Sequence, residues 1–316
     1  MINITFRQLR YFEAVARLQH FGRAADDCAI SQPALSMQIK ELEDALGTPL
    51  FERGGRQVRL TSFGELFATR AHDILRRVEE LGDLARAAGE KLSGQLRLGI
   101  IPTVAPYLLP TLIGHLARDF PDLDVNLRET VTPKLLAELA EGRIDTAIIA
   151  LPVSEPSLEE IALFTEDFVL VRPEADASLP VPEAAHLREM RLLLLEEGHC
   201  FREQAISFCE IGNRQPREIL DGSSLSTLVQ MVGAGIGVTL IPEMAVRVET
   251  RSAPVAVTRL EGHAPARTIG MVWRKSNPLA MRLAEIGEVV RRAGVELMQA
   301  ARTAGDATRP DTGAAR

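Results

Sequence analysis

The sequence predicts an α/β protein with a helical N-terminal segment, one long helix and a C-terminal α/β part that folds into two lobes. Three observations predict this fold class. Apolar residues recur at helical spacing in the first third of the chain, alternating strand and helix patterns begin at Gly94, and 316 residues are too many for one ordinary domain. We expect domains at 1–61, 62–93 and 94–302, and a disordered tail at 303–316.

The composition narrows the class of protein. A hydrophobic content of 46% and a charged content of 25% are typical of a soluble globular chain. The net charge of −7 argues against a wholly basic nucleic-acid coat protein, but it permits a local DNA-binding patch. Three cysteines cannot form a disulfide framework, and the start MINITFRQLR has no apolar signal region. We therefore expect a cytoplasmic protein.

The N-terminal segment predicts a helix-turn-helix. Helices are expected at 5–18, 21–29 and 32–46, with Cys28 in the core, Ser31 as the N-cap of the third helix and Gly47 as its stop. In this motif the start of the last helix enters the major groove of DNA. The side chains at that start are small, hydroxylated or amidic, so they can approach base edges closely and form hydrogen bonds with them. They are Ser31, Gln32, Pro33, Ala34 and Ser36.

The next stretch, FERGGRQVRLT, predicts a wing. Two short strands at 50–53 and 57–60 flank a glycine pair, and Arg53, Arg56 and Arg59 can reach phosphates. Residues 1–60 hold eight basic and seven acidic residues, so the negative charge resides in the remainder of the chain. This charge distribution, with the wing, supports DNA binding at the N-terminus.

The long helix is expected at 62–91. Its apolar residues alternate at spacings of four and three, which is typical of a coiled coil and favours a dimer contact. The seam consists of Phe67, Ala71, Ile74, Val78, Leu81, Ala85 and Ala88. The alternative is a helix that packs on its own domain. A hinge is expected at 92–94.

The remainder alternates between strand and helix patterns, which predicts a parallel sheet with helical crossovers. Strands are expected at 95–101, 125–129, 146–151, 168–171, 192–195, near 219, 238–241 and 268–272, and helices at 107–120, 133–142, 201–210, 223–232 and 278–298. Crossing strands near residues 165 and 267 would join two lobes and leave a cleft between them.

The stretch 196–210, EEGHCFREQAISFCE, carries two of the three cysteines. Only a thiolate is nucleophilic, and Arg202, a charged His199 and backbone N–H groups at a helix start would favour the anion of Cys200. Cys209 could resolve the oxidised form. If 201–210 is helical, nine residues rise by about 13.5 Å, whereas a disulfide needs Cα atoms within about 7 Å. Oxidation would therefore unwind the helix. Alternatively, Cys209 is a small buried hydrophobe.

These motifs resemble a known family. The run SQPALSMQIKELEDALGTPLFERGGRQVRLTSFG is similar to the N-terminal domain of LysR-type transcriptional regulators, and the likeness extends along the whole chain. GIIPTVAPYLLP, LEEGHCFREQAISFC and RTIGMVWRK resemble its peroxide-sensing OxyR branch. The resemblance implies a winged helix-turn-helix, a linker helix that pairs two chains, and a regulatory domain like a periplasmic solute-binding protein. It also implies a dimer of dimers.

The resemblance also implies roles for single residues. Cys200 would be oxidised by hydrogen peroxide to a sulfenic acid, and Cys209 would resolve it as a disulfide. The residues that match the peroxide pocket are Thr103, Thr132, His199 and Arg202; Arg267 lies in a matching strand with its role open. The alternatives are that both threonines only cap helices and that the histidine is an ordinary, partly buried one.

We therefore expect a peroxide-responsive transcription factor and no enzyme. It would bind double-stranded DNA, control antioxidant genes through RNA polymerase as an activator, a repressor or both, and be reduced by glutaredoxin or thioredoxin. One alternative is a LysR-type regulator with structural cysteines and a small organic inducer in the cleft. Another is a thiol peroxidase, against which the helix-turn-helix and wing argue. No metal or cofactor is expected, because the six histidines are scattered and no glycine-rich phosphate loop is present.

Overall fold

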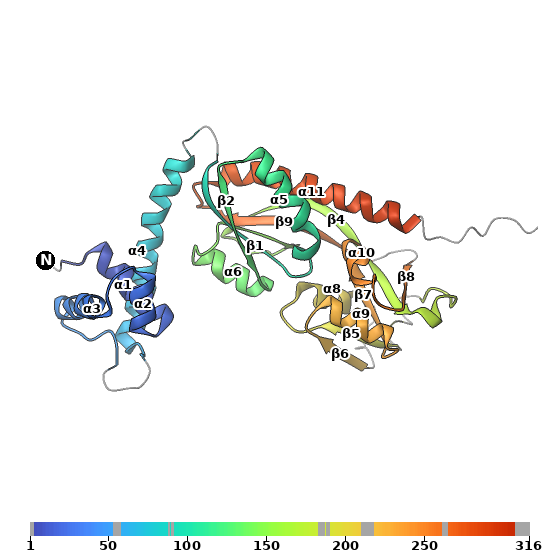
Figure 1. Ribbon diagram of the computed structural model, residues 1–316, viewed down its shortest axis with the longest axis horizontal. Coiled ribbons are helices and arrows are strands. Elements are labelled where there is room, and N and C mark those ends of the chain that lie inside the picture. Colours follow the sequence, from blue (N-terminus) through green and yellow to red (C-terminus); the bar gives the residue numbers. More distant parts are fainter. Residues whose placement is uncertain are drawn as a thin grey trace, which may run out of the picture. The chain divides into compact units, whose positions relative to one another are not determined.

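The computed structural model (Figure 1) describes residues 3–52, 58–87, 89, 92–182, 187, 190–209, 218–260 and 265–306. The chain forms two compact units, Met1–Ala85 and Arg86–Arg316. Among the described residues, no helix combines the length and the apolar character that crossing a membrane requires.

The N-terminal unit is a small helical domain. It contains α1 (Phe6–Leu18), α2 (Phe21–Asp27), α3 (Gln32–Leu46) and most of α4 (Ser62–Ala87). The Ser31 hydroxyl accepts a hydrogen bond from the Ala34 N–H and caps α3, and Gly47 ends this helix at a φ of 69°. The ring of Phe12 lies 5.5 Å from that of Phe51 and 5.0 Å from that of Phe67. These ring contacts bring α1, α4 and the chain that follows α3 into one core.

The predicted wing is described only at its base. Phe51 and Leu60 form an antiparallel bridge, and the Glu52 N–H donates to the Arg59 carbonyl over 2.9 Å. Residues 53–57, with the predicted phosphate-binding Arg53 and Arg56, lie outside the described residues.

The apolar seam of α4 divides into two parts. Phe67 and Ala71 pack against the core of the N-terminal unit. Ile74, Val78 and Leu81 are 44%, 39% and 65% exposed in the single chain. The helix therefore packs on its own domain at its start and leaves an apolar strip uncovered further along.

The C-terminal unit is built on one sheet with helices on its faces (Figure 1). Its strands are β1 (Gly94–Ile100), β2 (Leu123–Glu129), β3 (Thr146–Leu151), β4 (Leu158–Pro173), β5 (Arg191–Leu195), β6 (Glu218–Gly222), β7 (Val238–Pro242), β8 (Val255–Arg259) and β9 (Ala266–Arg274). The strand order is β2-β1-β3-β9-β4-β7-β5-β6, and β8 pairs with β4. The described helices are α5 (Ala105–Asp119), α6 (Thr132–Ala140), α8 (Cys200–Cys209), α9 (Leu225–Gly233), α10 (Val246–Glu249) and α11 (Ala280–Asp306).

Two lobes share this sheet. The first lobe contains β1–β3, β9, α5, α6 and α11, and the second contains β5–β8, α8, α9 and α10. The long strand β4 passes from the first lobe to the second: Leu158–Asp167 pairs with β9, and the following Phe168–Val171 pairs with β7. The predicted crossing near residues 165 and 267 is confirmed, because Glu166 lies opposite Arg267.

The prediction of a parallel sheet with helical crossovers is wrong at the crossing strands. β1 runs parallel to β2 and β3, and β5 runs parallel to β6 and β7. β4, however, is antiparallel to β7, β8 and β9. The reason is that β4 leaves the first lobe and β9 returns to it, so the two strands run in opposite directions.

The last helix is longer than predicted. α11 continues to Asp306 rather than ending at Met298, so residues 303–306 of the predicted disordered tail are helical. The added residues include Gln299, Ala300, Ala301 and Arg302, which have high helix propensities. Residues 307–316 lie outside the described part of the chain.

Candidate functional site

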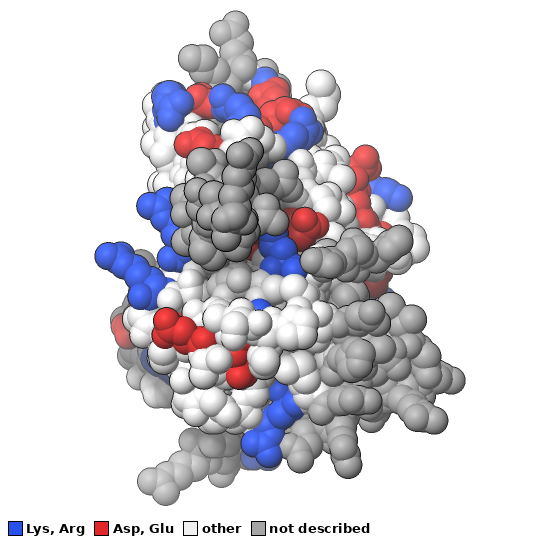
Figure 2. Space-filling view, turned by 90° about the vertical axis from the view of Figure 1, so that its right-hand side faces the viewer, with Lys and Arg blue, Asp and Glu red and all other residues white. Residues whose placement is uncertain are grey.

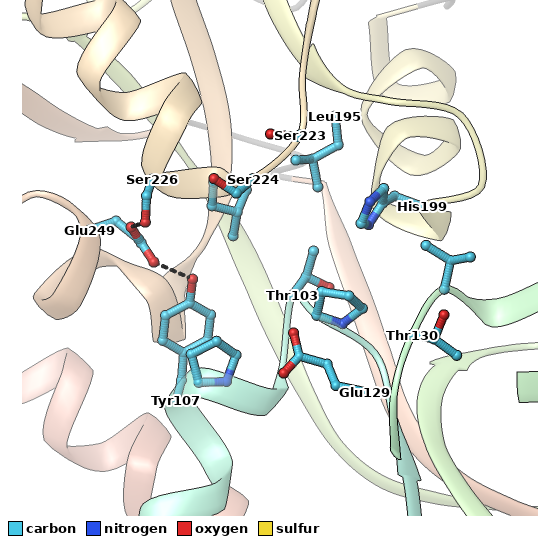
Figure 3. Close-up of a pocket in the computed structure, with 14 residues that line it drawn as sticks. Thr103, Tyr107, Glu129, Thr130, Leu195, His199, Ser223, Ser224, Ser226 and Glu249 are labelled. Carbon is cyan, nitrogen blue, oxygen red and sulfur yellow. Dashed lines mark hydrogen bonds between the residues drawn. The ribbon is translucent and has the colours of Figure 1, made fainter. Parts of the chain in front are cut away.

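A cavity of about 360 Å³ lies between the two lobes (Figure 3). The first lobe contributes Pro102, Thr103, Pro106, Tyr107, Glu129, Thr130 and Val131, and the second contributes Leu195, His199, Ser223, Ser224, Leu225, Ser226 and Glu249. Apart from Glu249, which ends α10, these residues lie at or just after the carboxyl ends of β1, β2, β5 and β6 or on the helix that follows. In open α/β sheets this is the edge at which small ligands bind.

Thr103 joins this cavity to a buried arginine. Arg267 Nη1 donates to Thr103 Oγ1 over 2.8 Å, and Nη2 donates to the Thr103 carbonyl over 3.0 Å. The N-cap of α5 is Val104, which makes no side-chain cap hydrogen bond. Thr103 therefore does not cap the helix, and the capping alternative is wrong at this position.

Thr132 does not line the cavity. It is the first residue of α6, whose N-cap is Val131, and no side chain caps this helix. The Thr132 hydroxyl oxygen is buried and has no hydrogen-bond partner among the described residues. A buried polar atom without a partner is rare in folded proteins, so this hydroxyl is available to a small polar molecule.

Cys200 is the first residue of α8 and is half-buried, with a free thiol. It packs against the core of the C-terminal unit and directly follows the cavity-lining His199. The next residue, Phe201, is buried; its ring lies 4.6 Å from that of Phe168 and 5.4 Å from the guanidinium carbon of Arg267. These contacts fix the first turn of α8 beside the cavity.

Gln204 is a site candidate that the sequence analysis missed. Its Oε1 is buried without a hydrogen-bond partner among the described residues. Because α8 begins at Cys200, the side chain four residues later lies on the same face, one turn away. This spacing from the cysteine could have identified it.

The side chains of His199 and Arg202 have different surroundings: the imidazole lines the cavity, and the guanidinium binds to the ends of two strands. Burial lowers the pKa of His199 below its ordinary value, and Glu196 opposes this shift. The imidazole is therefore neutral at pH 7 and lines the cavity as an uncharged group. Arg202 donates to the Leu195 carbonyl over 2.7 Å and pairs with Asp221, so its guanidinium ties α8 to the ends of β5 and β6.

Cys209 is the last residue of α8. Its side chain lies outside what the structure describes, so the choice between a resolving thiol and a buried hydrophobe rests on the backbone. The two cysteines are the first and last of the ten residues of α8, so nine helical steps separate their Cα atoms by a rise of about 13.5 Å. This is about twice the span that a disulfide permits.

A hydrogen-bonded bridge closes one side of the cavity (Figure 3). The Tyr107 hydroxyl on α5 donates to Glu249 Oε1 on α10 over 2.7 Å, and the Ser226 hydroxyl on α9 donates to the other carboxylate oxygen. Burial raises the pKa of Tyr107 well above its usual range, and the carboxylate of Glu249 adds to this shift. The phenol thus stays protonated and links the first lobe to the second.

We expect Tyr107→Phe to lower the free energy of unfolding of the C-terminal unit by about 1 kcal/mol. The variant removes one of the two donors that the described residues supply to the buried Glu249 carboxylate, and Ser226 is the other. Urea unfolding followed at Trp273, the one tryptophan, measures this change. Unchanged stability would show that the bridge does not hold the lobes.

Five of the candidate DNA-binding residues lie at the start of α3. Ser31, Gln32, Pro33 and Ser36 are exposed and Ala34 is half-buried, whereas Leu35, Ile39 and Leu42 are buried.

Figure 2 shows the side of the molecule that lies at the right of Figure 1, where the second lobe of the C-terminal unit is seen. On this face, acidic and basic side chains are interspersed among uncharged ones.

Two sequence families match the chain. Residues 6–65 match the bacterial regulatory helix-turn-helix proteins of the lysR family, and residues 89–294 match the LysR substrate binding domain. The chain belongs to the LysR family.

Within the described residues, no group of three His, Cys, Asp or Glu side chains could hold a metal ion.

The curated relatives include proteins named for OxyR or for hydrogen peroxide-inducible genes. The chain is 41% identical over 290 residues to the DNA-binding transcriptional dual regulator OxyR of Escherichia coli K12, which covers 91% of this chain and 95% of that protein. It is 43% identical over 291 residues to the probable hydrogen peroxide-inducible genes activator of Streptomyces viridosporus, covering 90% and 93%.

Solved structures of the LysR family have the same fold. Full-length OxyR of Pseudomonas aeruginosa, as a cysteine mutant, matches with a TM-score of 0.72 at 35% identity and covers 92% of this chain and 95% of that one. A cysteine mutant of Corynebacterium glutamicum OxyR with bound hydrogen peroxide matches with a TM-score of 0.65 at 36% identity, covering 96% and 99%.

Proposed function

We propose that this LysR-family protein is a DNA-binding transcription regulator that senses hydrogen peroxide through Cys200 and a reversible disulfide with Cys209. The observation that carries the proposal is a free thiol at the start of α8, beside a polar cavity, with the second cysteine at the other end of the same helix. The name of the Streptomyces viridosporus relative, which refers to hydrogen peroxide-inducible genes, supports it.

The first chemical step is oxidation of the Cys200 thiolate. Its sulfur attacks one peroxide oxygen, the O–O bond breaks, and the second oxygen leaves as hydroxide and takes up a proton to form water. The sulfur is oxidised to a sulfenic acid while the peroxide is reduced. Thr103 before α5, Thr132 at the start of α6 and Gln204 in α8 supply polar groups for binding the peroxide.

The second step couples chemistry to shape. The Cys209 thiol displaces water from the sulfenic acid and forms the disulfide, and thiols of glutaredoxin or thioredoxin later reduce it. Because an intact α8 keeps the two Cα atoms about 13.5 Å apart, this helix must unwind for the bond to form. Unwinding removes Phe201 from its contacts with Phe168 and Arg267.

The assembly of chains into dimers and tetramers transmits the conformational change at α8 to the DNA-binding units. The exposed strip of α4 pairs two chains, and two such dimers form the tetramer. Oxidation repacks the C-terminal units, rotates the paired N-terminal units on DNA and alters contact with RNA polymerase, which activates antioxidant genes. The protein works in the cytoplasm, where reductants reset the disulfide. Each molecule is oxidised once per signal, and the protein is not an enzyme.

Counting thiols after mild peroxide treatment tests the proposal. We expect each chain to lose two of its three thiols, and peptide mass mapping to join Cys200 to Cys209. Cys28 should remain reduced, since burial raises the pKa of its thiol and leaves less thiolate. If no thiol is lost, the protein is a LysR-type regulator that answers another signal, such as an organic inducer in the cavity.

We expect Leu81→Asp to weaken the dimer at least tenfold. Leu81 is 65% exposed on the apolar strip, and a carboxylate there would be buried in the coiled coil without a partner. Sedimentation velocity over a range of concentrations measures the effect. Glu79→Ala, at an exposed position on the same helix and away from the seam, is the control and should not change the dimer. Equal behaviour of both variants would contradict pairing through this strip.

A further inference from the structure

A buried ion pair lies where the crossing strands meet, and the proposed function assigns it no part. Glu166 on β4 and Arg267 on β9 are register partners, and both side chains are fully buried. Arg267 Nε donates to Glu166 Oε1 over 2.7 Å, and the Met244 N–H donates to Glu166 Oε2 over 3.4 Å. Burial raises the pKa of the Glu166 carboxyl, and the charge of Arg267 acts in the opposite direction.

The arginine of this pair contacts three separate parts of the C-terminal unit. It donates to Glu166 on the crossing strand, to both the hydroxyl and the carbonyl of Thr103 after β1, and its guanidinium lies 5.4 Å from the ring of Phe201 in the first turn of α8. The cavity wall and the residue that follows Cys200 thus touch one guanidinium. Its position depends on the carboxylate that accepts from Nε.

The polarity of the Thr103 hydroxyl follows from this arrangement. A guanidinium only donates hydrogen bonds, so the hydroxyl oxygen must be the acceptor of the 2.8 Å contact with Arg267. The hydroxyl hydrogen is then free to donate elsewhere. Because Thr103 lines the cavity, that hydrogen is available to a molecule within it.

We propose that Glu166 is a positioning residue for the reaction of Cys200 with hydrogen peroxide: through Arg267 it fixes Thr103 as a hydrogen-bond donor to the oxygen that leaves. The inference rests on the proposed function. When the O–O bond breaks, electrons move from sulfur to the leaving oxygen, and a donor held at that oxygen stabilises the developing hydroxide. Glu166 itself touches neither the peroxide nor the thiol.

The test compares two reactions of Cys200 in the full-length reduced protein. Peroxide needs a donor at the leaving oxygen, whereas alkylation by iodoacetamide needs the thiolate without that donor. In Glu166→Gln we expect the peroxide rate constant to fall at least about tenfold, an increase of about 1.4 kcal/mol in the barrier. The alkylation rate constant should stay within about twofold of wild type. Glu159→Gln, an exposed carboxylate on the same strand, is the control.

A double-mutant cycle tests the path through Thr103. Thr103→Val removes the donor, so adding Glu166→Gln to it should slow the peroxide reaction no further. If Glu166→Gln does not fold, Glu166→Asp keeps the charge but withdraws it by one methylene, and the same selective slowing of the peroxide reaction is expected.

The outcomes separate the two proposals. Equal slowing of both reactions, no slowing of either, or additive effects in the cycle would overturn the role of Glu166. Failure of wild-type Cys200 to react with peroxide would instead overturn the proposed function.

Discussion

Cys200→Ser is expected to abolish the response to peroxide while leaving DNA binding by the reduced protein within about twofold of wild type. A serine hydroxyl is not oxidised by peroxide, so neither the sulfenic acid nor the disulfide can form. Cys200 belongs to the C-terminal unit, whereas the candidate DNA-binding residues belong to the N-terminal unit. A reporter assay with and without peroxide, paired with a DNA mobility shift, measures both quantities.

Cys28→Ser is the matched control for this experiment. Cys28 lies half-buried at the end of α2 and packs against the core of the N-terminal unit. The variant should therefore keep the full peroxide response. A normal response in Cys200→Ser would contradict peroxide sensing at this thiol and favour an inducer-binding regulator.

Ser36→Glu is expected to weaken DNA binding about a hundredfold or more. Ser36 is exposed near the start of α3, the helix that enters the major groove in a helix-turn-helix. A carboxylate placed there is repelled by phosphates and loses any hydrogen bond that the hydroxyl donates to a base edge. Fluorescence anisotropy with a labelled promoter fragment at fixed salt measures the affinity.

Ala45→Glu provides the control for Ser36→Glu. Ala45 is exposed near the other end of α3, and the variant adds the same charge to the same helix. Nine helical steps from Ser36 to Ala45 correspond to a rise of about 13.5 Å. We expect only a small loss of affinity, and equal losses in both variants would mean that the start of α3 does not enter the groove.

Elements with local signals could be predicted from the sequence. The bounds of α3 follow from Ser31 and Gly47. The side chain of Ser31 caps the start of the helix, and the left-handed backbone conformation of Gly47 ends it; neither signal needs a tertiary contact. The strand β3 follows from its short apolar run. By contrast, only the last part of β4 was predicted. Its first half has an irregular burial pattern with a register shift between Ala162 and Phe164, so the alternation that predicts a strand is absent.

The candidate site likewise contains residues that the sequence could identify and residues that only the fold brings together. Cys200, His199 and Cys209 stand in one stretch, so their association with a single helix could be read from the sequence. The contacts of Arg267 with Thr103 and of Glu249 with Tyr107 join residues 164 and 142 positions apart. Only the crossing strands and the facing lobes bring these groups together, and no local pattern reports on that.

Hydrogen exchange in α8 tests most directly whether sensing depends on unwinding of this helix. The account predicts that amides of Cys200–Cys209 are protected in the reduced protein and lose protection in the peroxide-treated protein. In Cys209→Ser, which cannot form the disulfide, protection should persist after peroxide treatment. A Cys200–Cys209 disulfide in the mass spectrum together with unchanged protection of α8 would contradict the account.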